Sequence, residues 1–315
     1  MSGFNLNPQG TVPEWERRDF LKAAAAAAVA AATGQAAAAE PPTAEKKMPQ
    51  LRIGKYSFSR LICGNNPFGG GSHLSTFVNK EMKSYYTPEQ LRKTLHRCEE
   101  VGINTWQSGN SYLGFYRQYL DEGGKLQFLT IEAGSPDVIE KLAKGGCIGI
   151  AHHGEVTDTL FKKGQLDKVN EYLKRIRDAG LLVGVSTHMP AVVDAIESKG
   201  WDLDYYMTCV YERHRSEDAL KKLLGDVPLP PGEVYLRGDP PRMFKAIQQT
   251  KRPCLAFKIL AAGRLSERKE WVERAFRETF SSIKPGDGAI VGIYDRYSDQ
   301  PAEDAHLVRR YGFSS

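Results

Sequence analysis

Side chains suited to acid–base chemistry recur where the apolar, strand-like segments of this sequence end. His152 and His153 follow "CIGIA", and His188 follows "LLVGVST". Lys258 comes directly after "CLAF". The other polar residues at such ends are Asn65, Asn66, Gln107, Tyr112, Glu132, Glu212, His214, Asp295 and Arg296. Four of the seven histidines of the chain belong to this set, which favours one shared functional site over scattered structural roles.

The elements that must position these residues alternate between short apolar runs and longer segments with helical periodicity. Thr87 and Pro88 begin one such helix, and Gly180 and Gly200 end two others. The predicted strands are 60–64, 103–107, 126–134, 147–154, 181–188, 205–211, 254–260 and 289–294. Residues 51–315 are therefore predicted to form an α/β domain, a single (β/α)8 TIM barrel, with its active site at the carboxyl ends of the strands.

An open, doubly wound sheet is the alternative architecture. It is disfavoured because no G-x-G-x-x-G motif follows the first predicted strand. The glycines that do follow it, in "NNPFGGGSH" (65–73), are expected to form a flexible loop at the mouth of the barrel.

The N-terminal region carries the most specific motif of the sequence. Residues 16–40 read "ERRDFLKAAAAAAVAAATGQAAAAE", with paired arginines before a weakly apolar, alanine-rich stretch. This pattern resembles a twin-arginine export signal, with Glu16 where Ser or Thr is usual. An alanine-rich amphipathic or disordered tail is the alternative. We predict a signal peptide over 1–39, a linker over 40–50, and recognition by the twin-arginine export machinery.

The predicted location of the mature protein is periplasmic or otherwise extracytoplasmic. The apolar stretch is too short and too weakly hydrophobic for stable membrane insertion. The net charge of +5 is spread along the chain without a basic block that contains aromatic residues, so nucleic-acid binding is not expected. The five cysteines form no C-x-x-C pair, which argues against a zinc ribbon, an iron–sulfur site or a disulfide scaffold.

An anion site is predicted after the seventh strand, in "KILAAGRLS" (258–266). Lys258, Gly263 and Arg264 precede a helix expected to begin near Ser266, and the N–H groups of a helix N-terminus suit a phosphate. Arg296, after the eighth strand, is expected to join them because barrel phosphate sites often use the last two loops. An ordinary glycine-containing turn is the alternative.

Four segments resemble the aldo/keto reductase superfamily. They are "LRIGKYSFSRLICGNNPFGG" (51–70), "GINTWQSGNSY" (102–112), "GIAHHG" (149–154) and "LVGVSTHMPAVVDAI" (182–196). The resemblance implies Tyr112 as proton donor and His152 or His153 as the residue that orients the carbonyl. Gln107 stands where the family has an aspartate, and Glu132 or Ala133 stands where it has a lysine. A tyrosine with a pKa near 10 needs a neighbouring cation to act near neutrality, so the catalytic set is altered.

Three functions follow from these observations. The first is an NAD(P)-linked oxidoreductase for a small carbonyl or sugar substrate, with the NADP(H) phosphates near Lys258, Gly263, Arg264 and Arg296. The second is a metal-dependent lyase, isomerase or hydrolase in which a divalent transition metal is held by Glu132, His153, His188 and His214. Because side chains alternate along a strand, His152 and His153 do not both face inward. The third is a non-catalytic barrel that binds a small molecule.

Overall fold

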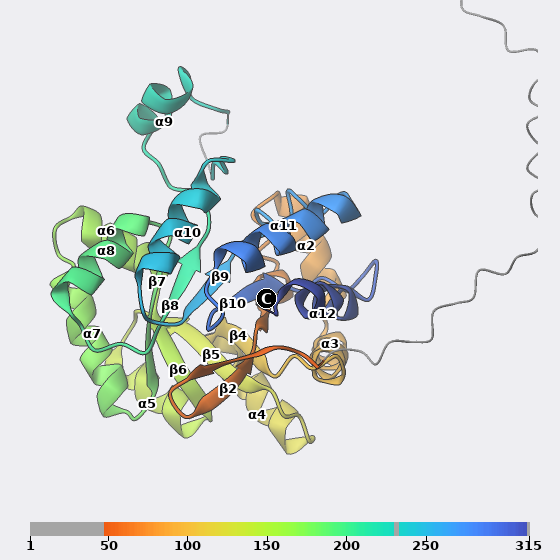
Figure 1. The fold of residues 1–315 in the computed structure, drawn as a ribbon. Coiled ribbons are helices and arrows are strands. Elements are labelled where there is room, and N and C mark those ends of the chain that lie inside the picture. The colour runs from red at the N-terminus through yellow and green to blue at the C-terminus, as the bar shows by residue number, and fades with distance from the viewer. Residues whose placement is uncertain (1–46, 230–232, 314–315) are drawn as a thin grey trace, which may run out of the picture. The chain divides into compact units, whose positions relative to one another are not determined.

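The computed structural model describes residues 47–229 and 233–313 of the chain. The predicted signal peptide and residues 40–46 of the predicted linker lie outside the described residues. The described residues belong to one compact unit that begins at Lys46. Within this unit, a ring of strands is surrounded by helices (Figure 1).

Eight parallel strands form a closed barrel, in which each strand pairs with its neighbour in sequence and the last pairs with the first. The strands are β3 (Leu61–Gly64), β4 (Thr105–Gly109), β5 (Gln127–Glu132), β6 (Cys147–His152), β7 (Leu182–Thr187), β8 (Tyr205–Cys209), β9 (Cys254–Phe257) and β10 (Gly288–Gly292). Each predicted strand segment overlaps one of them, so the TIM-barrel prediction is confirmed. The bounds differ by a few residues, and the strand expected at 103–107 runs from Thr105 to Gly109.

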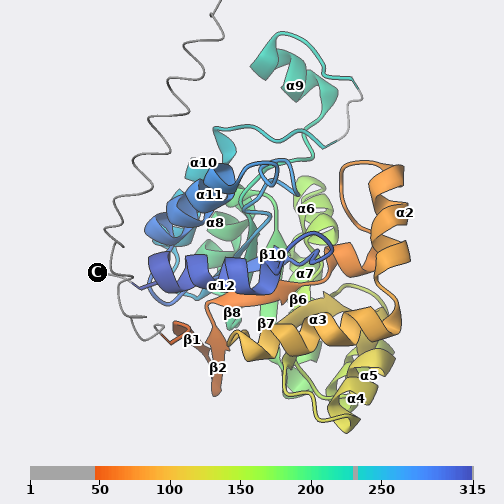
Figure 2. The same cartoon turned by 90° about the vertical axis from the view of Figure 1, so that its right-hand side faces the viewer.

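The described residues contain eleven α-helices, most of which surround the barrel (Figure 1). They are α2 (Thr76–Tyr85), α3 (Pro88–Glu100), α4 (Leu113–Asp121), α5 (Pro136–Lys144), α6 (Gly154–Lys162), α7 (Asp167–Asp178), α8 (Pro190–Lys199), α9 (Glu217–Leu224), α10 (Asp239–Gln249), α11 (Lys269–Ser282) and α12 (Gln300–Tyr311). The predicted caps are present: the Thr87 side chain accepts a hydrogen bond from the Gln90 amide, and Gly200 ends α8 in a left-handed conformation. Helix α9 projects away from the barrel in both views (Figure 2).

A short hairpin precedes the barrel. It consists of β1 (Gln50–Ile53) and β2 (Tyr56–Ser59), which pair antiparallel. Its apolar side chains belong to the same buried cluster as those of the barrel interior; this cluster comprises Leu51, Ile53, Phe58, Ile62, Leu129, Ala151, Leu182, Tyr205, Met207, Leu255 and Ile290. Because Gln50 is already in β1 and Met48 is buried, the folded domain begins before residue 51, where the linker was expected to end.

Two expectations about loops are wrong. The segment 65–73, expected as a flexible loop, contains the 3-10 helix η1 (Asn66–Gly69), and Gly70 ends that helix with a φ of 70°. Helix α2 follows it and was not predicted. The helix expected near Ser266 begins instead at Lys269.

All five cysteines are free and buried, as expected of small apolar residues. No helix of the described residues is long and apolar enough to cross a membrane.

The barrel interior requires a glycine where β7 passes the ring of Tyr205. A Cβ at Gly184 would overlap that ring. The Tyr205 side chain is fully buried and has no room to turn away. Gly184→Ala is therefore expected to lower the free energy of unfolding by about 2 kcal/mol, the usual effect of overpacking. Chemical denaturation measures this, with Gly114→Ala as control because no atom lies within 4 Å of a Cβ there. Equal stability of the two variants would contradict this packing.

Candidate active site

Solvent reaches the carboxyl end of the barrel. The last residues of four strands, Gly109, Glu132, Phe257 and Gly292, are partly or fully exposed, whereas the residues before them are mostly buried. In the closing pair of strands, Gly292 lies beside Gly64, and the packing is close enough that a Cβ on Gly64 would lie 3.0 Å from the backbone of Gly292. Solvent therefore contacts the chain at the ends of these four strands.

A buried acid–base pair at this end joins the residue after β7 to α6. The Nδ1 atom of His188 lies 2.8 Å from Oδ2 of Asp158, and both residues are buried. Asp158 also accepts hydrogen bonds from the Thr187 hydroxyl and, at 3.0 Å, from the His188 backbone amide. With Nδ1–H donated to the carboxylate, the imidazole is held in one orientation and its Nε2 atom is left as the available base.

The environment of His188 favours its neutral form. Burial lowers the pKa of His188, the hydrogen bond to Asp158 raises it in part, and the positive charges of Arg213 and Lys258 lower it again. Space for the ring depends on Gly154, since a Cβ there would lie 3.1 Å from Cε1 of His188. A neutral, oriented imidazole of this kind is suited to accept a proton from a substrate.

Lys258 follows β9 in a conformation that is unusual for a residue with a side chain. Its φ is +60°, in the left-handed region. Its ammonium group has no hydrogen bond or ion pair with any residue in the two described ranges. Burial lowers the pKa of Lys258 to about 8; Cys209 opposes this, and the charge of Arg213 contributes to it. At pH 7 roughly a tenth of the amine is therefore neutral.

Arg213, which follows β8, is the buried charge next to this lysine. Its guanidinium donates to Oε1 of Glu155 at 2.6 Å and also pairs with Glu233. These carboxylates have histidine partners as well: Glu155 lies 3.4 Å from His214, and Glu233 lies 2.8 Å from His73. Two carboxylates thus balance the charge of Arg213, and these ion pairs connect the loops after β3 and β8 to the first turn of α6.

Arg264, in contrast, has no carboxylate partner in the part of the chain that the structure describes. Its guanidinium lies 4.1 Å above the ring of Tyr235 and donates to the carbonyl oxygens of His73 and Ala261. Arg264 and Lys258 influence one another electrostatically. The structure therefore brings together two of the residues predicted to bind an anion.

The backbone around Arg264 does not form the predicted phosphate cradle. The amides of Ala261, Gly263, Arg264, Leu265 and Ser266 donate to carbonyl oxygens within the turn. These groups are occupied before any helix begins. Gly263 serves the turn itself, with a φ of +86°. Anion binding here would depend on side chains.

Arg296 lies in a different set of contacts. Its guanidinium is 3.6 Å from Glu81 of α2 and packs over the rings of Tyr85 and Tyr297. Neither Lys258 nor Arg264 is among its partners. Arg296 thus does not join the other predicted cofactor-binding residues in this structure.

Gln107 lies within β4, and Tyr112 follows that strand. Tyr112 ends the 3-10 helix η2 (Asn110–Tyr112), and its ring packs 5.6 Å from Trp106. Burial raises the pKa of Tyr112, and no charged group offsets this. Gln107 is buried and donates to the carbonyl oxygen of Ser108. A tyrosine in this environment is poorly suited to exchange protons near neutral pH.

The two adjacent histidines have different environments. His152 hydrogen-bonds Thr157 of α6 at 2.7 Å and packs against Tyr172 of α7, so it faces the helices. Burial lowers the pKa of His152 to about 4. His153 has a buried Nδ1 without a hydrogen-bond partner among the described residues. Of the two, His153 retains a ring nitrogen for a further contact.

Glu132 closes the loop after β5. Its carboxylate accepts hydrogen bonds from the amides of Ala133, at 2.8 Å, and Gly134, at 2.7 Å, and from the side chain of Asn110. No group of three or more potential ligands that could hold a metal ion occurs among the described residues. Although the rings of His188 and His214 lie 5.9 Å apart, the set Glu132, His153, His188 and His214 does not form a metal site in this structure.

The sequence reasoning missed several residues of the site. Asp158 lies inside a helix, where no motif marks it, and its role follows only from the packing of α6 against β7. Arg213 stands between the two polar residues that were singled out after β8. We call Lys258, His188, Asp158, Arg213 and Arg264 the Lys258 cluster. The sequence also did not single out His73, Glu155 and Glu233, which lie next to this cluster and pair with one another or with Arg213.

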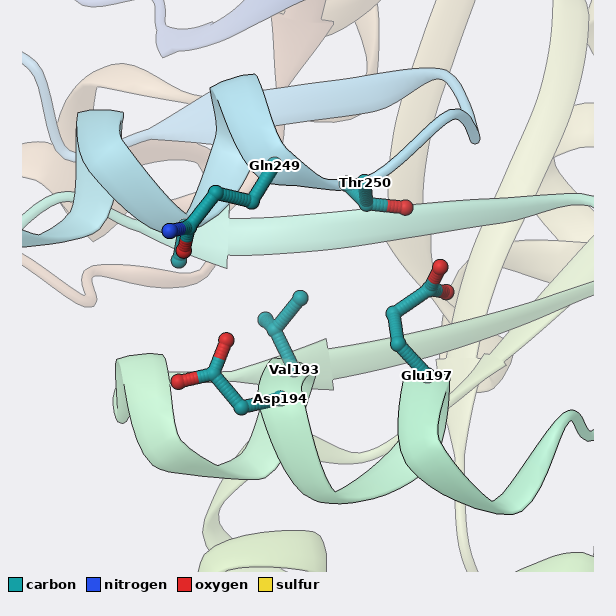
Figure 3. A pocket seen from close by; sticks show the side chains of 6 residues that line it. Val193, Asp194, Glu197, Gln249 and Thr250 are labelled. Atoms are coloured by element: carbon teal, nitrogen blue, oxygen red, sulfur yellow. The ribbon is translucent and has the colours of Figure 1, made fainter.

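A groove on the outer layer lies apart from this cluster. Figure 3 shows Val193, Asp194 and Glu197 of α8 facing Gln249 and Thr250 at the end of α10. Glu197 is already engaged, since it accepts hydrogen bonds from the Tyr206 hydroxyl and from Arg252. None of the residues predicted to be functional lines this groove.

A comparison with known protein families supports the export signal. Residues 16–34 match the family model for the "TAT (twin-arginine translocation) pathway signal sequence". No curated protein matches the chain. The chain is thus an exported (β/α)8 barrel, directed by the twin-arginine route to the periplasm or another extracytoplasmic space.

The similar solved structures differ widely in their functions. One is a glycerol dehydrogenase from Gluconobacter oxydans, with 14% identity, a TM-score of 0.47, and coverage of 85% of this chain and 98% of that one. Another is a truncated 3-deoxy-D-arabino-heptulosonate 7-phosphate synthase from Thermotoga maritima, with 14% identity, a TM-score of 0.47, and coverage of 84% and 90%. A third is the 3-hexulose-6-phosphate synthase of Salmonella typhimurium, with 15% identity, a TM-score of 0.44, and coverage of 80% and 97%.

Proposed function

We propose that this exported barrel is an enzyme that transfers a proton on a small carbonyl compound carrying an anionic group. The observation that carries this proposal is the buried His188–Asp158 pair beside Lys258, at the end of the barrel that solvent reaches. The pair provides an oriented base, and the lysine provides a positive charge for an oxygen that becomes negative. The reaction class is that of an isomerase or a lyase.

The anionic group follows from the charge pattern. Arg213 is balanced by Glu155 and Glu233, whereas Lys258 and Arg264 have no carboxylate partner in the described ranges. A carboxylate or phosphate on the substrate would supply the missing negative charge. Arg264 suits this role because a guanidinium binds either group through two hydrogen bonds.

Each of these residues then has one role in the reaction. Arg264 holds the anionic group, Lys258 faces the carbonyl, and Nε2 of His188 removes the proton from the neighbouring carbon. Asp158 keeps the imidazole in the tautomer that leaves Nε2 unprotonated. The polarised carbonyl lowers the energy of the enolate that forms, since the lysine charge lies where the oxygen charge develops.

Proton exchange tests the proposal without knowledge of the product. The protein is incubated in D2O with a panel of pyruvate, 2-oxobutanoate, dihydroxyacetone phosphate and uncharged acetone, and loss of the proton signal is followed by NMR. We expect exchange on at least one anionic compound and none above background on acetone. Background rates for the whole panel would refute the proposed function.

Arg264→Met separates anion binding from chemistry. Loss of a charge-assisted hydrogen bond costs at least about 1.5 kcal/mol, so KM for the exchanged anion should rise about tenfold or more, with a smaller change in kcat. Arg274→Met, at an exposed position of α11, is the matched control and should behave as the unaltered protein. An unchanged KM in Arg264→Met would mean that the anion is bound elsewhere.

An NADP(H)-linked oxidoreductase is the second candidate, supported by the closeness of Lys258 and Arg264. The two cations fit the phosphates of the cofactor, whereas the occupied amides of the turn offer it nothing further. Tyr112, the donor implied by the resemblance, lacks the neighbouring cation that its chemistry needs. Native mass spectrometry of the precursor purified from the cytoplasm tests this candidate, because a mass excess equal to NADP(H) would favour it over a cofactor-free enzyme.

A further inference from the structure

The side chain of Lys258 is directed by an unusual backbone. Residues along a strand alternate between the two faces, so the residue after Phe257 would regularly take the opposite face. The φ of +60° at Lys258 breaks this alternation, and it does so at a cost for a residue with a Cβ. The ring of Phe257, the residue before Lys258, lies 5.7 Å from the ring of His188, and the charges of Arg213 and Arg264 act on the Lys258 ammonium.

This placement has no structural benefit among the described residues. The Lys258 side chain is partly buried and its ammonium forms no ion pair there, and the positive charges of Arg213 and Arg264 act on it, offset in part by Glu155. Lys284 offers a contrast, since its ammonium lies 2.9 Å from Asp287 and donates to the carbonyl oxygen of Ile247. A desolvated lysine beside other cations is the arrangement that makes an amine nucleophilic.

We infer that Lys258 is a covalent catalyst, whose amine forms an imine with the carbonyl carbon of an anionic aldehyde or ketone. The inference rests on the proposed function and extends it, because it makes the lysine a reacting group and not only a source of charge. An iminium withdraws electrons from the neighbouring carbon more strongly than a carbonyl does. Removal of a proton by His188 is thereby made easier.

The covalent step balances without any further reactant. His188 removes one proton from the Lys258 ammonium, and the free amine adds to the carbonyl carbon, forming a C–N bond as the C=O π bond breaks. A second proton moves from nitrogen to oxygen to give a neutral carbinolamine. His188 returns its proton to the hydroxyl, water leaves, and a protonated imine remains. The sum is an ammonium and a carbonyl giving an iminium and one water.

Reductive trapping tests the inference. The full-length mature protein is treated with sodium borohydride in the presence of pyruvate or dihydroxyacetone phosphate, and the adduct is located by peptide mass spectrometry. At pH 7 an amine with a pKa of about 8 is neutral on the order of a hundredfold more often than an ordinary lysine. We therefore expect Lys258 to be labelled on the order of a hundredfold faster than the exposed Lys245.

Two variants make the result specific. Lys258→Arg keeps the charge but cannot form an imine, so it should lose the adduct while its thermal unfolding shows that it folds. Lys245→Arg should keep the adduct. Labelling spread equally over surface lysines, or unchanged in Lys258→Arg, would overturn the inference.

The trapping experiment tests the covalent step, and the exchange experiment tests the proposed proton transfer, so the two can fail independently. Exchange without an adduct would overturn the covalent step and leave the proposed proton transfer in place. An adduct at Lys258 without exchange on any anionic compound would support the imine and count against proton transfer as the function.

Discussion

Asp158→Asn is expected to lower the rate of substrate proton exchange about 10³- to 10⁴-fold, the size of effect seen when an aspartate that orients a catalytic histidine is replaced by asparagine. The carboxylate accepts from Nδ1–H of His188, which leaves Nε2 as the base. An asparagine that donates its amide N–H to Nδ1 moves the proton to Nε2, where it blocks the reaction. The comparison requires the exchange rate at saturating substrate, measured by NMR.

His188→Asn should lose at least as much activity as Asp158→Asn, and the double variant should lose no more than His188→Asn alone, because residues that act as a unit are not additive. Asp167→Asn is the control, since that carboxylate is on the exposed face of α7, where it pairs with Lys199. Thermal unfolding must accompany these measurements, because Asp158 also holds the Thr187 hydroxyl. Near-normal exchange in a folded Asp158→Asn protein would remove the pair from the mechanism.

The parts of this fold that could be predicted are those with a local cause. Strands β3 to β10 follow from apolar runs of the right length, and helices such as α3 follow from a capping threonine and a proline. The barrel then follows from counting eight such units. The segment 65–73 misled the prediction because its glycines were taken for flexibility, whereas Gly70 is the left-handed end of a short helix.

The candidate site could be predicted only in part, for a related reason. The ends of the strands were enough to select His188, Lys258 and Arg264. Their roles depend on residues brought in by tertiary packing, above all Asp158, which comes from the middle of α6. The sequence likewise could not indicate that Glu132 is engaged by its own loop or that His152 faces the helices.

Lys258→Met is expected to stabilise the folded protein, by up to about 3 kcal/mol at pH 7. The pKa of this lysine is lowered from 10.5 to about 8, chiefly by burial, so the folded state holds its proton less tightly than the unfolded state does. Methionine fills similar space with no charge to desolvate. Denaturant unfolding of the two proteins gives the difference directly.

The pH dependence identifies the cause. Below pH 8 both states of the unaltered protein are protonated at Lys258, and the full penalty is present. Between pH 8 and 10.5 the unfolded state binds more protons, so the unaltered protein gains stability relative to Lys258→Met as the pH rises. The window is best read up to about pH 9.5, because burial raises the pKa of the neighbouring Cys209 to about 11. Lys245→Met, at an exposed site, should show no such trend.

A gain in stability in Lys258→Met would bear on both parts of the proposal, the proton transfer and the imine at Lys258. A residue that lowers stability and is needed for activity is the expected form of a trade-off between stability and function. Lys258→Met should then be more stable than the unaltered protein and yet inactive in exchange and in trapping. If the variant is instead less stable at every pH, Lys258 holds the cluster together through its charge, and the case for a reactive amine fails on thermodynamic grounds.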